Sequence, residues 1–223
     1  MSFLEIDKKN IRGSPYVGIF CVVTEKFGLF PKTIDRHEIE KLSDFFGVEA
    51  VPATIAGTSL LGVLATGNSH GIIVSGVADE REISELQELG LKVAVVDNIA
   101  AVGNLARAND NGGVCSKIFS KEARGRMEKA LNVEFRPMEI AGTGLAGSCL
   151  VATNRGFLAN PGVSKESFAE LRKIFGVDGA LTTANYGDAC VGNSIVANSK
   201  AAIVGEQTSG FELLRIDEGL SGR

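Results

Sequence analysis

The stretch "GNSIVANSKAAIVG", residues 192–205, closely resembles "GVLATGNSHGIIVS" at residues 62–75. Both begin with a glycine, carry an asparagine six positions later and continue into a short apolar run. Repetition at a nearly fixed spacing is the signature of a fold assembled from copies of one unit. The rest of the chain carries three further copies of the pattern.

Five units therefore make up the chain, and their anchor glycines are separated by 44, 41, 44 and 45 residues. The units begin near Gly18, Gly62, Gly103, Gly147 and Gly192. The residues six positions further on are Thr24, Asn68, Asn109, Thr153 and Asn198. Asparagine and threonine in this setting, between two short apolar segments, predict a tight turn. Each unit is thus expected to open with a β-hairpin.

An amphipathic helix is predicted after each hairpin, as in "DRHEIEKLSDFFG" at residues 35–47. The expected N-caps are Asp35, Asp79, Ser120, Ser164 and Thr208, with Glu38 and Glu82 completing capping boxes. The expected helix ends are Gly47, Gly90, Asn132, Gly176 and Gly219. A third strand follows the helix, as in "LKVAVV" at residues 91–96. One unit therefore contains two strands, a helix and a further strand.

A unit of about 44 residues cannot bury its sheet and its helix alone, so the units must pack on one another. They could form an open stack, two separate domains or a closed ring. Neither end of the repeat array shows the polar cap that an open stack requires, and closure removes exposed sheet edges. We expect an α/β fold in which residues 1–223 form a single ring-shaped domain with fivefold pseudosymmetry, strands inside and helices outside.

The composition points to a cytoplasmic protein. Charged residues make up 22% of the chain and the net charge is -4, which disfavours broad binding to phosphates. No apolar run reaches the length of a membrane-spanning helix, and the first residues do not resemble a signal peptide. The four cysteines are far apart and form no metal-binding pattern, so we predict buried thiols, no metal and no cofactor.

Seven ordered segments carry a family resemblance: "GSPYVGIF", "TIAGTSLLG", "GNSHG", "AVGNLARANDNGG", "ATNRGFLANP", "TANYG" and "IVANSKAAIVGEQTSGFELLRI". They resemble the translation initiation factor 6 family, whose fold is the αβ-propeller called the pentein. The resemblance runs from about Asn10 to Leu220 and includes a motif from every repeat. Because the chain stops at Arg223, it is similar to the shorter archaeal form, which lacks a regulatory tail.

The resemblance implies binding to the intersubunit face of the large ribosomal subunit, where the bound protein sterically prevents the small subunit from joining. It implies roles in initiation and in large-subunit maturation. The expected partner is a ribosomal protein beside the sarcin-ricin loop, with limited contact to the rRNA backbone. A mildly acidic protein suits a basic protein partner better than bare RNA. We expect a monomer that binds no membrane.

Two alternatives remain open at this point. Pentein folds also include enzymes that modify guanidino groups with a cysteine nucleophile and a histidine, and Cys190 would be the nucleophile here. The two histidines, His37 and His70, are poorly placed for that role. The other alternative is an assembly scaffold unrelated to ribosomes.

Residues that break the repeat are the better candidates for binding, because the ring itself has no need to vary one unit. The candidate ribosome-binding residues are Asn68, His70, Asn104, Arg107, Asn109, Asp110, Asn111, Asn185, Tyr186 and Asn193. Asn68 and Asn109 also fit a purely structural turn role, and Tyr186 fits either an interface anchor or a partly buried ring. The turn residues Lys26, His70, Arg155 and Lys200 would form a partly basic rim, either solvated or touching RNA.

Overall fold

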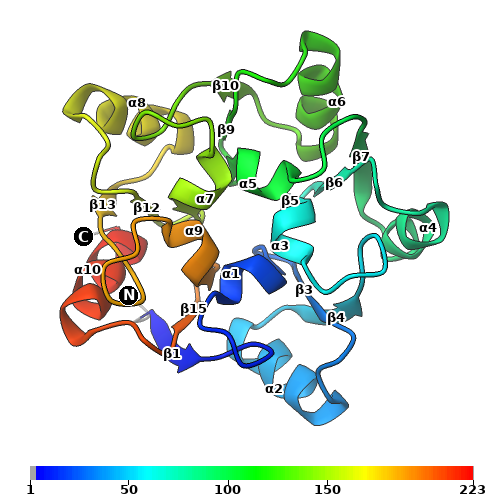
Figure 1. Cartoon of the computed structure of the whole chain (residues 1–223), viewed down its shortest axis with the longest axis horizontal. Helices are drawn as coiled ribbons and strands as arrows, with labels where there is room; N and C mark the ends of the chain where they lie inside the picture. The colour runs from blue at the N-terminus through cyan, green and yellow to red at the C-terminus, as the bar shows by residue number, and fades with distance from the viewer. Residues whose placement is uncertain (1–3, 223) are drawn as a thin grey trace.

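Five blades form a closed ring in the computed structural model, which describes residues 4–222 (Figure 1). Each blade contains a three-stranded sheet. A long helix covers the outside of each blade, and a short helix lies toward the centre of the ring (Figure 1). The predicted α/β ring with fivefold pseudosymmetry, strands inside and helices outside, is confirmed.

The first two strands of each blade form the predicted antiparallel hairpin. The inner strands are β2 (Val22–Val23), β5 (Ala65–Asn68), β8 (Ala106–Ala108), β11 (Leu150–Ala152) and β14 (Ile195–Ala197). The middle strands are β3 (Phe27–Pro31), β6 (Gly71–Ser75), β9 (Gly113–Cys115), β12 (Phe157–Ala159) and β15 (Ala201–Gly205). The inner strands line the centre of the ring.

An outer strand pairs in parallel with each middle strand. The outer strands are β4 (Glu49–Ala53), β7 (Lys92–Val96), β10 (Phe135–Pro137), β13 (Gly179–Leu181) and β1 (Glu5–Lys9). In the first four blades the outer strand follows the long helix of the same blade, as expected. The fifth blade instead takes β1 from the start of the chain, with Glu5 opposite Ala201 and Lys9 opposite Gly205. This pairing, which the repeat pattern did not predict, closes the ring.

The long outer helices start as predicted in four blades out of five. They are α2 (Arg36–Phe46), α4 (Glu80–Glu88), α6 (Lys121–Leu131), α8 (Lys165–Phe175) and α10 (Gly210–Ser221). The side chains of Asp35, Asp79, Ser120 and Ser164 each accept the expected backbone N–H bond. Ser209, not Thr208, caps α10, because Thr208 is buried and its hydroxyl accepts from the backbone N–H of Asn185.

Two other predictions about the helix ends are corrected. The capping box at Glu82 is present, but the carboxylate of Glu38 instead pairs with the Lys9 ammonium at 2.6 Å. Gly219 does not end α10 but lies inside it, where a Cβ atom would come within 2.5 Å of Leu158 and 2.8 Å of Ala180. Among residues 4–222, no helix is both long and apolar enough to cross a bilayer.

The anchor glycines lie in short helices rather than in the predicted strands. These helices are α1 (Val17–Phe20), α3 (Leu61–Leu64), α5 (Val102–Leu105), α7 (Ala146–Cys149) and α9 (Val191–Ser194). A Cβ atom on Gly62 would lie 1.8 Å from the carbonyl oxygen of Gly18, and one on Gly18 would lie 2.1 Å from that of Gly192. Each anchor glycine contacts the preceding one in this way. The repeated glycine is therefore required by close backbone packing around the centre.

The hydrophobic core consists of five clusters, each shared by neighbouring blades. One combines Ile73, Ala94 and Val96 of the second blade with Met127 and Leu131 of the third. The other four clusters join the remaining neighbours in the same way. A blade therefore completes the burial of its apolar surface against its neighbours, as the length of the repeat predicts.

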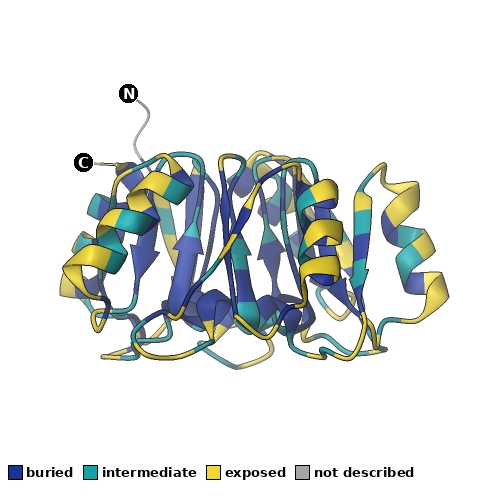
Figure 2. Ribbon diagram, turned by 90° about the horizontal axis from the view of Figure 1, so that it is seen from above, coloured by how far each residue is buried: buried dark blue, intermediate teal, exposed yellow. Residues whose placement is uncertain are grey.

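The ring has two different faces, and Figure 2 shows it from the side. Each inner strand leaves its short helix, reaches a hairpin turn at the opposite face, and the middle strand returns to the start of the long helix. We call the face with the short helices and the starts of the long helices the short-helix face. The face with the five hairpin turns is the turn face.

Candidate functional site

The candidate binding residues are divided between the two faces. His70, Asn111, Asp110, Asn68 and Asn109 lie in or beside the turns of the turn face. The remaining candidates on the surface belong to the other side, because Asn104 is in α5, Asn193 is in α9 and Tyr186 is in the loop before α9. The structure therefore does not bring the predicted residues together into one site.

Asn68 and Asn109 are buried turn residues that also tie blades together. The Oδ1 atom of Asn68 accepts from the backbone N–H of His70 within its own turn. Its Nδ2 atom donates to the carbonyl oxygens of Asn109 at 3.0 Å and Leu131 at 2.9 Å, both in the next blade. Asn109 repeats this arrangement toward Thr153 and Phe175 of the fourth blade. Ribosome contact through these two amides is not supported, since both are occupied inside the ring.

The residue after each turn asparagine or threonine closes the centre of the turn face. Asp110 accepts from the backbone N–H and the hydroxyl of Ser69 at 2.8 and 2.6 Å, and from Nδ2 of Asn154 at 2.6 Å. Burial acts to raise the pKa of Asp110, but these hydrogen bonds outweigh burial and lower it. Asp110 therefore links three consecutive blades rather than projecting toward a partner.

Arg107 extends into the centre of the ring. It contacts a cavity of about 30 Å³ lined by the inner strands. Its Nη2 atom donates to the carbonyl oxygen of Gly147 at 2.8 Å, while the buried Nε atom has no hydrogen-bond partner among the described residues. Burial lowers the pKa of Arg107 to about 10, so the guanidinium stays charged at neutral pH. Arg107 is therefore half-buried at the centre of the ring, and its side chain is held by the backbone of the next blade.

The expected basic rim is partly used for capping helices. Nζ of Lys200 donates to the carbonyl oxygen of Asp44 at 2.8 Å, near the end of α2. Nε of Arg155 donates to that of Ser221 at 3.3 Å, and Nδ2 of Asn111 to that of Phe175 at 2.8 Å. Cations and donors at these positions satisfy the unpaired carbonyls of helix ends. Their role is therefore at least partly structural, whereas Lys26 is exposed.

Tyr186 is the most exposed of the large apolar side chains described on the short-helix face, with 86% of its surface accessible. The alternative of a partly buried ring is therefore wrong. Its backbone lies in the left-handed region, with φ at 66°, which is costly for a residue with a bulky side chain. The preceding Asn185 is buried, and its Nδ2 atom donates to the carbonyl oxygen of Pro15 and to Ser194. The hydrogen bonds of Asn185 therefore hold the loop in place, and the loop exposes the side chain of Tyr186 to solvent.

A carboxylate from α10 holds the Tyr186 loop. Glu212 accepts from the backbone N–H groups of Tyr186 at 3.2 Å and Gly187 at 2.8 Å. Burial acts to raise its pKa, but hydrogen bonds from Ser209, Thr183 and Gly187 outweigh it and lower the pKa to about 2. The carboxylate therefore stays ionised at neutral pH and stabilises the strained loop.

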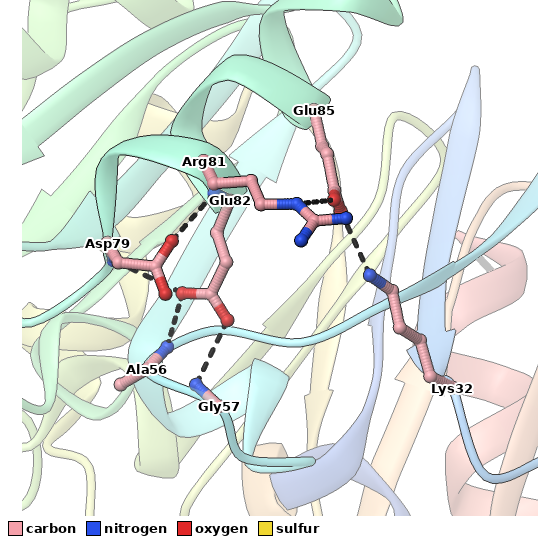
Figure 3. Close-up of polar contacts among 7 residues, drawn as sticks. All are labelled: Lys32, Ala56, Gly57, Asp79, Arg81, Glu82 and Glu85. Carbon is pink, nitrogen blue, oxygen red and sulfur yellow. Dashed lines mark hydrogen bonds and ion pairs between the residues drawn. The ribbon is translucent and has the colours of Figure 1, made fainter.

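In the second blade, a helix carboxylate likewise accepts hydrogen bonds from the backbone of a loop, as Figure 3 shows. Glu82 of α4 accepts from the backbone N–H groups of Ala56 at 2.6 Å and Gly57 at 2.9 Å. Ala56 also has a left-handed backbone, with φ at 52°. Nearby, Lys32 of the first blade donates to Glu85 at 2.9 Å, so a surface ion pair joins the two blades. In the sequence, Glu82 is recognisable as part of a predicted capping box. Glu212 occupies the same position, as the third residue of α10, and it also forms a capping box.

Exposed apolar side chains gather on the short-helix face. Tyr16, Leu60 and Leu145 are the N-cap residues of three of the short helices. Val77, Ile118, Tyr186 and Phe211 lie in the loops or first helical turns on the same side. Of the exposed large apolar residues described, only Leu89 and Leu214 lie elsewhere. Such a collection of apolar side chains on one side is typical of a protein–protein interface.

Cys190 is not arranged as a nucleophile. It is the N-cap residue of α9, and burial first, then the Asp188 carboxylate and Cys149, raise the pKa of its thiol. Reactive cysteines require the opposite shift. His70 lies on the turn face, and His37 is exposed on the first turn of α2 in another blade. Within the described part of the chain, no cluster of His, Cys, Asp or Glu could hold a metal ion.

Comparison with known proteins identifies the relatives of this chain. The model of the eIF-6 family matches residues 6–219. "Translation initiation factor 6" of Pyrococcus abyssi is 33% identical over 224 residues, covering 97% of this chain and 99% of that protein. The protein of the same name from Haloquadratum walsbyi is 35% identical over 216 residues, covering 96% of this chain and 95% of its own.

Two of the solved structures that are similar to this chain belong to dimethylarginine dimethylaminohydrolases. A dimethylarginine dimethylaminohydrolase adduct with S-methyl-L-thiocitrulline has a TM-score of 0.48 at 12% identity, covering 92% of this chain and 73% of the enzyme. The corresponding enzyme from Pseudomonas aeruginosa, in complex with citrulline, has a TM-score of 0.43 at 14% identity, covering 93% of this chain and 73% of its own.

Proposed function

The chain belongs to the eIF-6 family, and we propose that it binds the large ribosomal subunit at its intersubunit face and sterically blocks the small subunit. The observation that carries the proposal is the family match over residues 6–219, together with relatives named translation initiation factors. The protein acts in the cytoplasm, in initiation and in maturation of the large subunit. We treat residues 1–223 as one functional ring that works as a monomer and without a cofactor.

The short-helix face is the binding surface in this proposal. It presents Tyr186, and it carries Asn104 in α5 and Asn193 in α9, whose side chains make no hydrogen bond within residues 4–222. It also carries the ring of apolar residues Tyr16, Leu60 and Leu145. Aromatic and aliphatic side chains beside unpaired amides match the composition of protein interfaces. The turn face supports binding less well, because its asparagines and carboxylates are occupied by contacts between blades.

The partner on the ribosome is a basic protein beside the sarcin-ricin loop, with limited contact to rRNA. A net charge of -4 and the apolar surface favour a protein partner over a phosphate backbone. Blocking requires only occupancy of the surface, so no reaction is needed. The raised pKa of Cys190 and the separation of the two histidines give no support to a guanidino-modifying enzyme.

Sedimentation tests this proposal directly. Purified large subunits should carry the protein through a sucrose gradient, and saturating protein should shift an equilibrium mixture of subunits away from joined ribosomes. Small subunits alone should not carry it. Failure to co-sediment with intact large subunits from the same source would overturn the proposal. So would binding that leaves subunit joining unchanged.

A further inference from the structure

The outer edge of β7 differs from the four equivalent edges of the ring. In a parallel pair, alternate residues of a strand turn both backbone groups toward the partner strand, and the residues between them face away. The carbonyl oxygen of Val96 accepts from the backbone N–H of Gly76, so Lys92, Ala94 and Val96 face inward. The backbone groups of Val93 and Val95 therefore point away from the sheet.

Two of the other outer strands lose an outward N–H group through proline. In β4, Ala53 faces inward, so Ala50 and Pro52 face outward, and Pro52 has no N–H. In β10, Phe135 and Pro137 face outward. Pro137 also lacks an N–H, and the N–H of Phe135 donates to Glu128 at 3.0 Å. These edges cannot pair fully with an added strand.

The remaining two outer strands satisfy an outward N–H with a neighbouring carboxylate. In β1, the N–H of Lys8 donates to Asp7 at 2.9 Å. In β13, the N–H of Gly179 donates to Asp178 at 3.0 Å. β7 has no proline, and the outward backbone groups of Val93 and Val95 have no partner within residues 4–222. Of the five outer edges described, β7 alone keeps both outward donors free.

A groove of about 540 Å³ runs along this edge, between β7 and α6 at the outer rim of the ring (Figure 1). Its two walls differ because side chains alternate along a strand. Leu91, Val93 and Val95 are half-buried against the core of the second blade and form an apolar wall. Lys92 lies on the opposite side of β7, with Ala94 and Val96, which pack in the cluster shared with α6.

The wall on the α6 side is basic. Lys92, Arg126 and Lys129 line it, and all three are exposed. Asp97 is the one acidic residue lining the groove, and it pairs with Arg126 at 3.3 Å. Lys92 and Lys129 form no ion pair within the described chain. The groove therefore has a net positive charge beside its free backbone donors.

We propose that this edge binds an extended acidic peptide segment of a partner protein by strand addition. The backbone of the segment pairs with the outward N–H and C=O groups of Val93 and Val95. An alternation of apolar and acidic residues places the apolar side chains against Leu91, Val93 and Val95, and the carboxylates against Lys92 and Lys129. The site lies on the outer rim and is independent of the ribosome-binding function proposed above.

A designed peptide tests the proposal with the full chain. The probe is a fluorescent, end-blocked peptide of alternating glutamate and valine, measured by fluorescence anisotropy. We expect saturable binding that is lost when glutamate is replaced by lysine, or when the backbone nitrogens that face β7 are methylated. On binding, amide hydrogen exchange should slow at Val93 and Val95. Unchanged exchange at both amides, or equal binding of the lysine peptide, would overturn the proposal.

Variants of the protein measure separately how backbone pairing and charge contribute to binding of the probe. Val95→Pro removes one outward N–H and should weaken probe binding by about tenfold. Lys92→Glu with Lys129→Glu should weaken it by about threefold per lysine, without touching the strand. Lys165→Glu with Lys173→Glu, on α8 of another blade, is the matched control and should not change it. The charge variants keep the test valid if the proline variant fails to fold.

Measurement of the oligomeric state tests whether a second copy of the chain occupies the β7 edge instead. Pairing of two β7 edges would bring together two grooves of net positive charge, which disfavours a dimer. A concentration-dependent dimer that Val95→Pro abolishes would identify a second copy as the occupant, and would overturn the peptide proposal.

Discussion

The Glu25 carboxylate of the first blade accepts a hydrogen bond from the backbone N–H of Asn154, in the fourth blade, at 3.0 Å. It also accepts from the backbone N–H and the hydroxyl of Ser199, in the fifth blade. Glu25 therefore joins three blades at the centre of the turn face, over the cavity that Arg107 contacts. Asp110 makes the corresponding link between the second, third and fourth blades.

Loss of this carboxylate should destabilise the ring. We expect Glu25→Ala to lower the free energy of unfolding by about 1–3 kcal/mol, because it leaves half-buried donors of Asn154 and Ser199 without their partner. Urea denaturation measures the change. Glu40→Ala, at an exposed position of α2 that pairs with Arg36, should change stability by less than about 0.5 kcal/mol. Equal effects of the two substitutions would contradict the bridging role.

The glycine ring predicts opposite effects for two glycine substitutions. Gly103→Ala places a Cβ atom 2.1 Å from the carbonyl oxygen of Gly62, so we expect a loss of at least about 3 kcal/mol or failure to fold. Gly125→Ala lies in the interior of α6 with open space around it, and should stabilise by about 0.5–1 kcal/mol. Thermal and urea unfolding compare the two. A tolerated Gly103→Ala would contradict the close packing at the centre.

The turn asparagines should stabilise the fold by more than the formation of their own turns. Asn109→Thr keeps a residue that serves the same turn in the first and fourth blades, where Thr24 and Thr153 stand. It removes the Nδ2 bonds to Thr153 and Phe175 in the next blade. We expect a loss of about 1–2 kcal/mol in unfolding free energy, with unchanged circular dichroism. No measurable loss would reduce Asn109 to a local turn residue.

Glu212 should make stability depend on acidic pH. Its pKa falls from the ordinary value of 4.5 to about 2 in the fold, because its hydrogen bonds outweigh the effect of burial. A depressed pKa gives a stabilisation that is complete above the unfolded value and is lost as the pH falls from about 4.5 toward about 2. Glu212→Gln should therefore be less stable than the natural protein at neutral pH. The difference should shrink as the pH approaches 2, and a constant difference would contradict the assignment.

The two faces can be compared by binding. Tyr186→Ala with Asn104→Ala should weaken co-sedimentation with large subunits by at least about tenfold, since exposed aromatic anchors carry much of the energy of interfaces. The melting temperature should barely change, because both side chains are accessible. Leu89→Ala, at an exposed apolar residue outside the short-helix face, is the matched control. A large fall in melting temperature would assign Tyr186 and Asn104 to the fold instead.

The sequence alone determined the five units and most of their local structure. Turn residues such as Asn68 and helix caps such as Asp79 act through hydrogen bonds to atoms only a few residues away, so their signals are visible in a short window. The same local logic failed at Thr208 and Gly219, where contacts with distant segments decide the role. Ordered motifs from every repeat were enough to indicate the family.

Tertiary structure alone decided on which face of the ring each candidate residue lies. Repeat position cannot tell the turn face from the short-helix face, and so the sequence grouped Asn109 and Asp110 with Tyr186, although the first two serve contacts between blades. It also could not show that β1 completes the fifth sheet, that the anchor glycines touch one another, or that β7 keeps a free edge. These features depend on contacts between atoms from distant parts of the chain. Sequence periodicity predicts local structure, but it does not predict which distant segments come into contact.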